Sequence, residues 1–231
     1  MHEIAPGIYR WTAAHPEWRT TSEAIPSYAL VCGKTLALVD PLLPAHDSAE
    51  HVEVDRVLSD LIEAAQHLEI LITIPYHTRS AEELFHRYHT LLATRIWGHK
   101  NVTKRFADAD TPLHEIIVGR AHASAASSVE VADGIATAFA IGSPRRVETP
   151  LYFPAHKALF FGDAIVNTEG TLRVWSWAPT KPGWHETRFL PTLMPLLDLE
   201  VENVLVTHGP PVIGGGSAAL RAALEAPPTA Y

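Results

Sequence analysis

The chain has 231 residues, of which 47% are hydrophobic and 19% are charged, and its formal net charge is −8. This length and hydrophobic content suit one large domain with a full core, or two small domains. Its only basic stretches, "KNVTKR" and "PRR", are short, which argues against nucleic acid as a partner.

No apolar run approaches the roughly 20 residues that span a bilayer. The first residues, "MHEIAPGIYRW", lack the basic region and apolar segment of a signal peptide. We therefore expect a cytoplasmic protein with no membrane partner. The single cysteine, Cys32, excludes an internal disulfide and a cysteine-rich zinc site. It lies in an apolar stretch, which predicts a buried, inert thiol.

The first third of the chain has a β-rich and then an α/β pattern. Residues 27–41, "SYALVCGKTLALVDP", predict two strands around a Gly-Lys turn, and the second strand is apolar enough to be buried on both faces. Residues 45–68 have apolar side chains at helical spacing. Residues 69–74, "EILITI", predict a short buried strand.

A helix is expected next, over residues 80–92, with Ser80 and Glu83 forming a capping box. Residues 94–99 then predict a strand, and residues 100–106 a short helix.

The pattern changes after residue 114 and then returns. Residues 115–161 alternate in polarity between glycines and prolines, as antiparallel strands do. Residues 185–199 predict a helix interrupted by prolines, residues 201–209 a buried strand, and residues 216–226 a closing helix. Two similar halves of this kind predict a single domain over residues 1–231, a four-layer αββα sandwich with helices outside two packed sheets.

Four stretches, in this order, resemble the metallo-β-lactamase superfamily: "LALVDPLLP", "ILITIPYHTRSAEEL", "YFPAHKALFFGDAIV" and "VLVTHGPPV". In that family the first ends in a structural Asp, and the second carries a His-x-His-x-Asp-His motif. The third leads to a Gly-Asp that supplies the metal-bridging carboxylate, and the His of the fourth is a ligand. The resemblance covers roughly residues 1–225 and implies the metallo-β-lactamase-like fold.

Most of the family's ligand positions are changed on the second stretch. The two His positions hold Ile74 and Tyr76, the Asp position holds Thr78, and the following His position holds Arg79. The third strand's His is expected beside Pro144, where no His occurs. A catalytic zinc needs about three protein ligands and an open position for water.

Two of the family's ligands, Asp163 and His208, are retained. They are too few for two-metal hydrolysis, so we expect no cofactor, with zinc or another divalent metal as the alternative. We expect the Arg79 guanidinium to take the metal's place and pair with Asp163, with His208 and Tyr76 within hydrogen-bonding reach. The alternative is that Arg79 points to solvent.

His77 is the remaining candidate for chemistry on the turn, and its alternative role is a loop His that bonds backbone groups. His77, Asp163 and His208 are thus the candidate catalytic residues and, if a metal binds, its ligands. Trp175, Trp177, Trp184 and His185 follow the Gly-Asp loop and are candidate ligand-binding residues. The Trp rings alternatively fill the vacated cleft or form a contact with a second copy of the chain.

The changed ligands favour a metal-free, non-hydrolytic protein that binds an unidentified small molecule or a partner in the old active-site cleft. The alternative is a metal-dependent hydrolase with a rebuilt mononuclear site.

Overall fold

The computed structural model describes residues 1–15, 24–142, 147–175 and 183–229. The chain divides into two compact units, Met1–Glu115 and Ile116–Tyr231. The single-domain organisation of residues 1–231 stays a prediction. None of the helices in the described part of the chain has the length and hydropathy needed to cross a membrane.

Unit 1 contains a seven-stranded sheet in sequential order, with antiparallel pairs among its first four strands and parallel pairs afterwards. Its strands are β1 (His2–Ala5), β2 (Ile8–Ala14), β3 (Ala24–Cys32), β4 (Thr35–Val39), β5 (His67–Leu71), β6 (Ala93–Gly98) and β7 (His114–Glu115). Its helices are α1 (Ala49–Ala64), α2 (Ala81–Tyr88) and the 3₁₀ turns η1 (Pro75–His77) and η2 (Lys100–Arg105).

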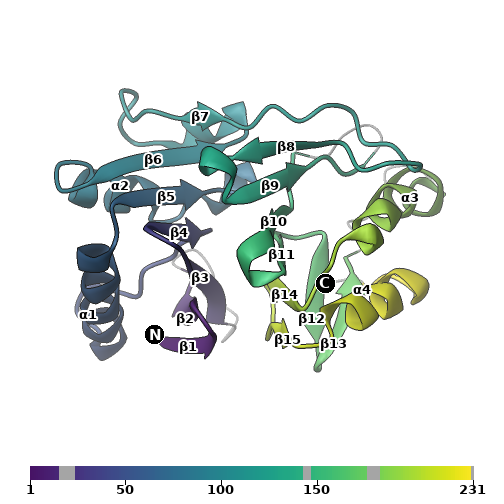
Figure 1. Cartoon of the computed structure of the whole chain (residues 1–231), viewed down its shortest axis with the longest axis horizontal. Coiled ribbons are helices and arrows are strands. Elements are labelled where there is room, and N and C mark those ends of the chain that lie inside the picture. Colours follow the sequence, from purple (N-terminus) through teal and green to yellow (C-terminus); the bar gives the residue numbers. More distant parts are fainter. Residues whose placement is uncertain (16–23, 143–146, 176–182, 230–231) are drawn as a thin grey trace. The chain divides into compact units, whose positions relative to one another are not determined.

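Helices α1 and α2 cover one face of this sheet (Figure 1). The helical spacing seen in the sequence produces this contact, because Val54, Leu58 and Ile62 of α1 are all buried in one core cluster. Leu84 of α2 joins the same cluster, which includes side chains from the middle strands of the sheet. Burial raises the pKa of the Cys32 thiol at the end of β3 to about 11, as suits an unreactive cysteine.

Unit 2 contains a six-stranded sheet in the order β15-β14-β11-β10-β9-β8 and a separate β12–β13 hairpin. Its strands are β8 (Ser128–Val131), β9 (Ala136–Phe139), β10 (Leu151–Phe153), β11 (Ala158–Phe161), β12 (Ile165–Thr168), β13 (Thr171–Val174), β14 (Asn203–Val206) and β15 (Val212–Ile213). Its helical segments are η3 (Ala132–Gly134), η4 (Pro154–His156), η5 (His185–Phe189), α3 (Leu190–Leu193), η6 (Met194–Asp198) and α4 (Gly216–Glu225).

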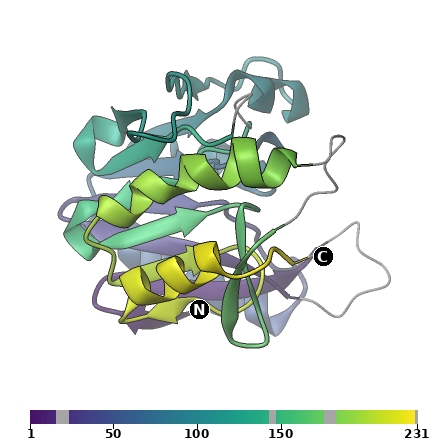
Figure 2. The same ribbon diagram turned by 90° about the vertical axis from the view of Figure 1, so that its right-hand side faces the viewer.

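Helices α3 and α4 lie over one face of the six-stranded sheet (Figure 2). The expected proline-interrupted helix is confirmed: residues 185–198 form π-helical, α-helical and 3₁₀ segments in succession, with prolines at the starts of the second and third. The parallel pair β11–β14 is entirely buried and forms the centre of the unit.

Candidate functional site

The first part of the site lies where two neighbouring parallel strands of unit 1 end. Strands β4 and β5 pair Val39 with Leu71, so Asp40 and Thr73 follow at the same edge of the sheet. Asp40 is fully buried. Its carboxylate accepts hydrogen bonds from the Thr73 backbone N–H at 2.9 Å, the Thr73 hydroxyl at 2.5 Å and His77 Nδ1 at 2.9 Å. An ionised carboxylate suits three donors.

This arrangement fixes the imidazole of His77. The Asp40 carboxylate acts only as an acceptor, so Nδ1 of His77 carries the hydrogen and, in the neutral ring, Nε2 carries the lone pair. The side chain is buried, and its exposed fraction is 7% for the whole residue. His77 therefore binds a side-chain carboxylate, whereas the alternative role expected from the sequence was a loop His that bonds backbone groups.

The neighbouring residues of the turn point in different directions. Ile74 is buried, and Tyr76 is 55% exposed with the Arg105 guanidinium 4.2 Å from the centre of its ring. Arg79 adopts a left-handed conformation, with φ of 44°, and its Nη1 donates to the Asp40 carbonyl oxygen at 2.8 Å. The pairing of Arg79 with Asp163 joins residues of different units and stays a prediction.

The expected capping box at the start of α2 is wrong. Ser80 makes no side-chain cap for this helix, and its hydroxyl instead accepts the backbone N–H of Leu43 at 2.9 Å. Glu83 binds Arg87 one turn further along the helix at 2.9 Å. Ser80 therefore joins the loop after β4 to the turn that carries His77, because a tertiary contact replaces the local cap.

The second part of the site lies in unit 2, again at the ends of parallel strands. Strands β11 and β14 pair Phe161 with Val206, and two residues further along this register stand Asp163 and His208. Both are buried, and Asp163 Oδ1 lies 3.4 Å from His208 Nε2. The hydroxyl of Thr207 donates to the carbonyl oxygen of Gly162, which extends the ladder into this turn.

Strand β12 holds the His208 loop. The backbone N–H of Asn167 donates to the His208 carbonyl oxygen at 2.9 Å, and its side-chain amide donates to the Pro210 carbonyl oxygen at 2.8 Å. Gly209 has a φ of 84°, and a Cβ at this position would lie 2.0 Å from the carbonyl oxygen of Asn167. Only glycine allows the loop to approach β12 so closely.

The candidate tryptophans lie in two surroundings. The ring of Trp175 lies 5.9 Å from that of His208, centre to centre. Trp184 stacks on Phe189 at 5.5 Å, and His185 meets the same phenylalanine edge to face. Trp177 lies outside the described residues. Within unit 2, therefore, Asp163, His208 and Trp175 come together, while Trp184 and His185 gather around Phe189.

Three residues that the structure places at the site were not among the candidates from the sequence: Asp40, Thr73 and Asn167. From the sequence, Asp40 was predicted only to match the structural Asp that ends the first strand motif of the metallo-β-lactamase superfamily. The signal for it is an Asp at the end of a buried apolar strand, which here takes a φ of 45°. For Asn167 the sequence carries no comparable signal, because its partners lie in a distant loop.

Solved structures with similar folds were found. A metallo-β-lactamase family protein from Thermus thermophilus is 19% identical, with a TM-score of 0.60 over 96% of this chain and 78% of its own. A metallo-β-lactamase from Erythrobacter litoralis is 14% identical, with a TM-score of 0.62 over 97% and 93%. The mono-zinc form of FIM-1 from Pseudomonas aeruginosa is 14% identical, with a TM-score of 0.62 over 96% and 92%.

The chain has the metallo-β-lactamase fold. The fold class predicted from the sequence, two large sheets with helices as in metallo-β-lactamases, is thereby confirmed. No protein-family model matches the sequence, and no curated protein matches it either.

The residues that the sequence resemblance aligns with the family's metal ligands do not supply the donor set of a zinc pair. On the turn of residues 74–79, Ile74 has no donor atom, Arg79 carries a positive charge, and Nε2 of His77 is a nitrogen that suits a metal. In unit 2, Asp163 and His208 are suitable donors but are only two. Within the described ranges there is no cluster of three or more His, Cys, Asp or Glu side chains arranged to hold a metal ion. No hydrolytic step through a metal pair follows from these residues.

Proposed function

We propose that this chain is a metal-free, non-hydrolytic protein of the metallo-β-lactamase fold. It binds a small molecule or a partner where the fold ordinarily carries its active site. The candidate residues for this binding are His77, Asp163 and His208, together with Arg79, Tyr76, Trp175, Trp177, Trp184 and His185.

The observation that carries the proposal is the chemistry of the turn from Thr73 to Ser80. Of its side chains, only His77 offers a neutral nitrogen, while Ile74 is buried and apolar. Arg79 donates to the carbonyl oxygen of Asp40, the residue whose carboxylate binds His77, so its positive charge is held at this turn. A fixed cation raises the free energy of a dication at this turn and favours anionic or hydrogen-bonding groups of a ligand.

The second candidate is a metal-dependent hydrolase with a rebuilt mononuclear site. Two observations favour it. Asp40 holds His77 through Nδ1 and so makes Nε2 the ring nitrogen with the lone pair, as carboxylates behind metal-ligating histidines do. Asp163 and His208 are a buried carboxylate and imidazole 3.4 Å apart. If a metal binds, His77, Asp163 and His208 are its expected ligands.

Elemental analysis of the purified protein separates the two candidates. It is done before and after soaking in zinc and manganese, with Asp163→Ala and, as a matched control, the exposed Asp60→Ala. The proposal predicts less than one equivalent of metal in every sample. One equivalent that disappears in Asp163→Ala and persists in Asp60→Ala overturns the proposal and supports the hydrolase.

A further inference from the structure

A short basic helix lies directly beside the turn that carries His77. The helix η2 follows β6, and its Val102 is fully buried. Gly98 at the end of β6 makes this packing possible, because a Cβ there would lie 2.9 Å from Val102 Cγ2 and 3.4 Å from the Cβ of Ile72. Segments η1 and η2 are consequently in contact.

The geometry of a 3₁₀ helix directs one basic side chain toward η1. Such a helix has three residues per turn, so Arg105 lies on the same side as the buried Val102. Its guanidinium lies 4.2 Å from the centre of the Tyr76 ring. A guanidinium stacked on a ring keeps its N–H donors at the edge, where they can reach a carboxylate or phosphate.

Three of the chain's 18 Lys and Arg residues occur within the six residues of η2: Lys100, Lys104 and Arg105. All three are exposed, and none has a carboxylate at ion-pair distance among the residues that the structure describes. We call these three residues and Tyr76 the η2 lip.

Several basic residues elsewhere in the chain are paired. Arg56 binds Glu53 and Asp60, and Arg87 binds Asp55 and Glu83, with N–O distances of 2.7 to 3.3 Å. Arg95 and Lys157 each have carboxylate partners at 3.0 Å or less. The charges of the η2 lip therefore contrast with these pairs, in a chain whose net charge is −8.

Two carboxylates near the η2 lip, those of Glu82 on α2 and Asp108, are bonded to the loop that follows η2. The Glu82 carboxylate accepts the backbone N–H groups of Ala107 and Asp108 and the hydroxyl of Thr111, at 2.7 to 3.0 Å. The Asp108 carboxylate accepts the backbone N–H of Asp110 at 2.9 Å and lies 3.7 Å from His86. These carboxylates hold the loop after η2 and leave the lip positively charged.

We propose that the η2 lip binds the anionic group, a carboxylate or a phosphate, of a small molecule whose remainder reaches the His77 turn. This inference rests on the proposed function and names its ligand class. Arg105, stacked on Tyr76, supplies directional donors, and Lys104 and Lys100 supply additional positive charge. With only three cations on an acidic chain, the site suits a small anion better than a nucleic acid.

The test is a titration of the ¹⁵N-labelled full chain with citrate and, separately, with inorganic phosphate at low ionic strength. Glycerol is the uncharged control. We expect saturable amide shifts at Tyr76 and over residues 100–105 with at least one anion, and none with glycerol. The tighter of the two anions identifies the preferred group. If neither anion produces saturable shifts there, the proposal is overturned.

Charge variants give the second measurement. Arg105→Gln and Lys104→Gln should each raise the Kd of the bound anion about fivefold, the upper range for one exposed ion pair. Arg56→Gln removes the same charge from a paired site on α1 and should leave the Kd unchanged. If Arg56→Gln and Arg105→Gln raise the Kd equally, only the net charge of the chain matters. That result would overturn the proposed anion site at the η2 lip.

The two proposals fail separately. If the protein holds one equivalent of metal and also shows the anion-dependent amide shifts at the η2 lip, the metal-free function is contradicted and anion binding at the η2 lip is supported. If the protein is metal-free and shows no such shifts, anion binding at the η2 lip is contradicted and the metal-free function is supported.

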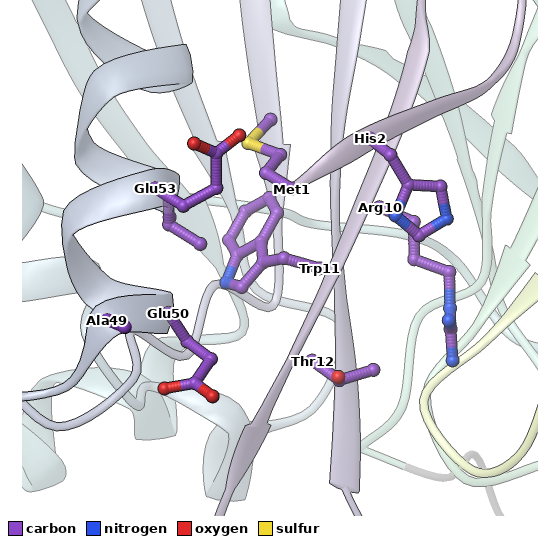
Figure 3. Close-up of a pocket in the computed structure, with 9 residues that line it drawn as sticks. Met1, His2, Arg10, Trp11, Thr12, Ala49, Glu50 and Glu53 are labelled. Atoms are coloured by element: carbon purple, nitrogen blue, oxygen red, sulfur yellow. The ribbon is translucent and has the colours of Figure 1, made fainter.

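A pocket of about 360 Å³ also lies in unit 1, between α1 and β1–β2 (Figure 3). Trp11, Glu50 and Glu53 lie on its helix side, and the side chains of His2 and Arg10 extend on the opposite side of β2 (Figure 3). Glu53 is already paired with Arg56.

Discussion

Replacing Asp40 by Asn tests whether this carboxylate organises the His77 turn. The fully buried carboxylate accepts three hydrogen bonds, two from Thr73 and one from His77. An Asn side chain has one acceptor oxygen, so whichever way it turns, its NH₂ group faces at least one of these donors. The left-handed backbone at Asp40 is no obstacle, because Asn adopts it as readily as Asp.

The expected loss is about 1.5–6 kcal/mol, since hydrogen bonds to a buried charge contribute about 1.5–3 kcal/mol each and one or two are lost. This is a large part of the roughly 5–15 kcal/mol of a typical domain. The assay is urea unfolding, in which the midpoint should fall while the slope stays constant. A ¹⁵N spectrum of the His77 ring should also show loss of the Nδ1–H tautomer.

The matched control is Asp60→Asn. Asp60 pairs with Arg56 at 3.3 Å, but its side chain is 69% exposed, so the expected cost is below about 1 kcal/mol. A loss for Asp40→Asn as small as that for Asp60→Asn, with the His77 tautomer unchanged, would refute the reasoning.

Three further perturbations have defined outcomes. Gly209→Ala should lower the free energy of unfolding by about 3 kcal/mol or more in chemical denaturation, because the new Cβ would meet a backbone oxygen of β12 at 2.0 Å. Arg95→Met should cost about 3 kcal/mol in the same assay, because it leaves the buried Glu69 carboxylate without its cation. Glu82→Gln should flatten the acid side of the stability–pH curve. Burial alone would raise the pKa of Glu82, but the N–H groups of residues 107 and 108 and a threonine hydroxyl lower it below the ordinary 4.5. The stability it supplies is therefore present above about pH 4.5 and lost as the pH falls through the lowered pKa.

Each of these predictions has a control variant. Gly214→Ala also has a positive φ but nothing within 4 Å, so it should cost only about 1–2 kcal/mol. Arg56→Met removes an exposed, paired arginine and should cost under about 1 kcal/mol. Glu63→Gln, on the exposed face of α1, should leave the acid limb unchanged. A variant that behaves like its control contradicts the corresponding contact.

The sequence patterns predicted β3 to β6, α1 and α2 because these patterns are local, whereas no strand was predicted over β1, β2, β12 or β13. The apolar stretch before Asp40 and the helical spacing of Val54, Leu58 and Ile62 each reflect burial of one face or of a whole strand. The boundaries differ by a few residues: α1 spans Ala49–Ala64 within the expected 45–68, and α2 spans Ala81–Tyr88 within the expected 80–92.

The site was less predictable because its contacts are long-range. Ser80 was a plausible cap, yet its hydroxyl serves Leu43, 37 residues earlier. The pairing of His77 with Asp40 also spans 37 residues, and no local pattern encodes it. The partnership of Arg105 with Tyr76 depends on the packing of η2 against β6, which the composition of "KNVTKR" does not indicate.

The register of β11 and β14 has a consequence for how this site can change in evolution. The carboxylate of Asp163 and the imidazole of His208 each stand two residues past paired positions of a hydrogen-bonded ladder. The register of these two strands sets the separation of the two groups, and β12, within the segment between them, holds the His208 loop. The parts of that segment outside β12 and the buried side chains of α3 can therefore be lengthened, shortened or replaced by recombination while the two groups keep their spacing. Ligand preference in this fold can thus change through substitution of such an insert, while the spacing of Asp163 and His208 stays the same.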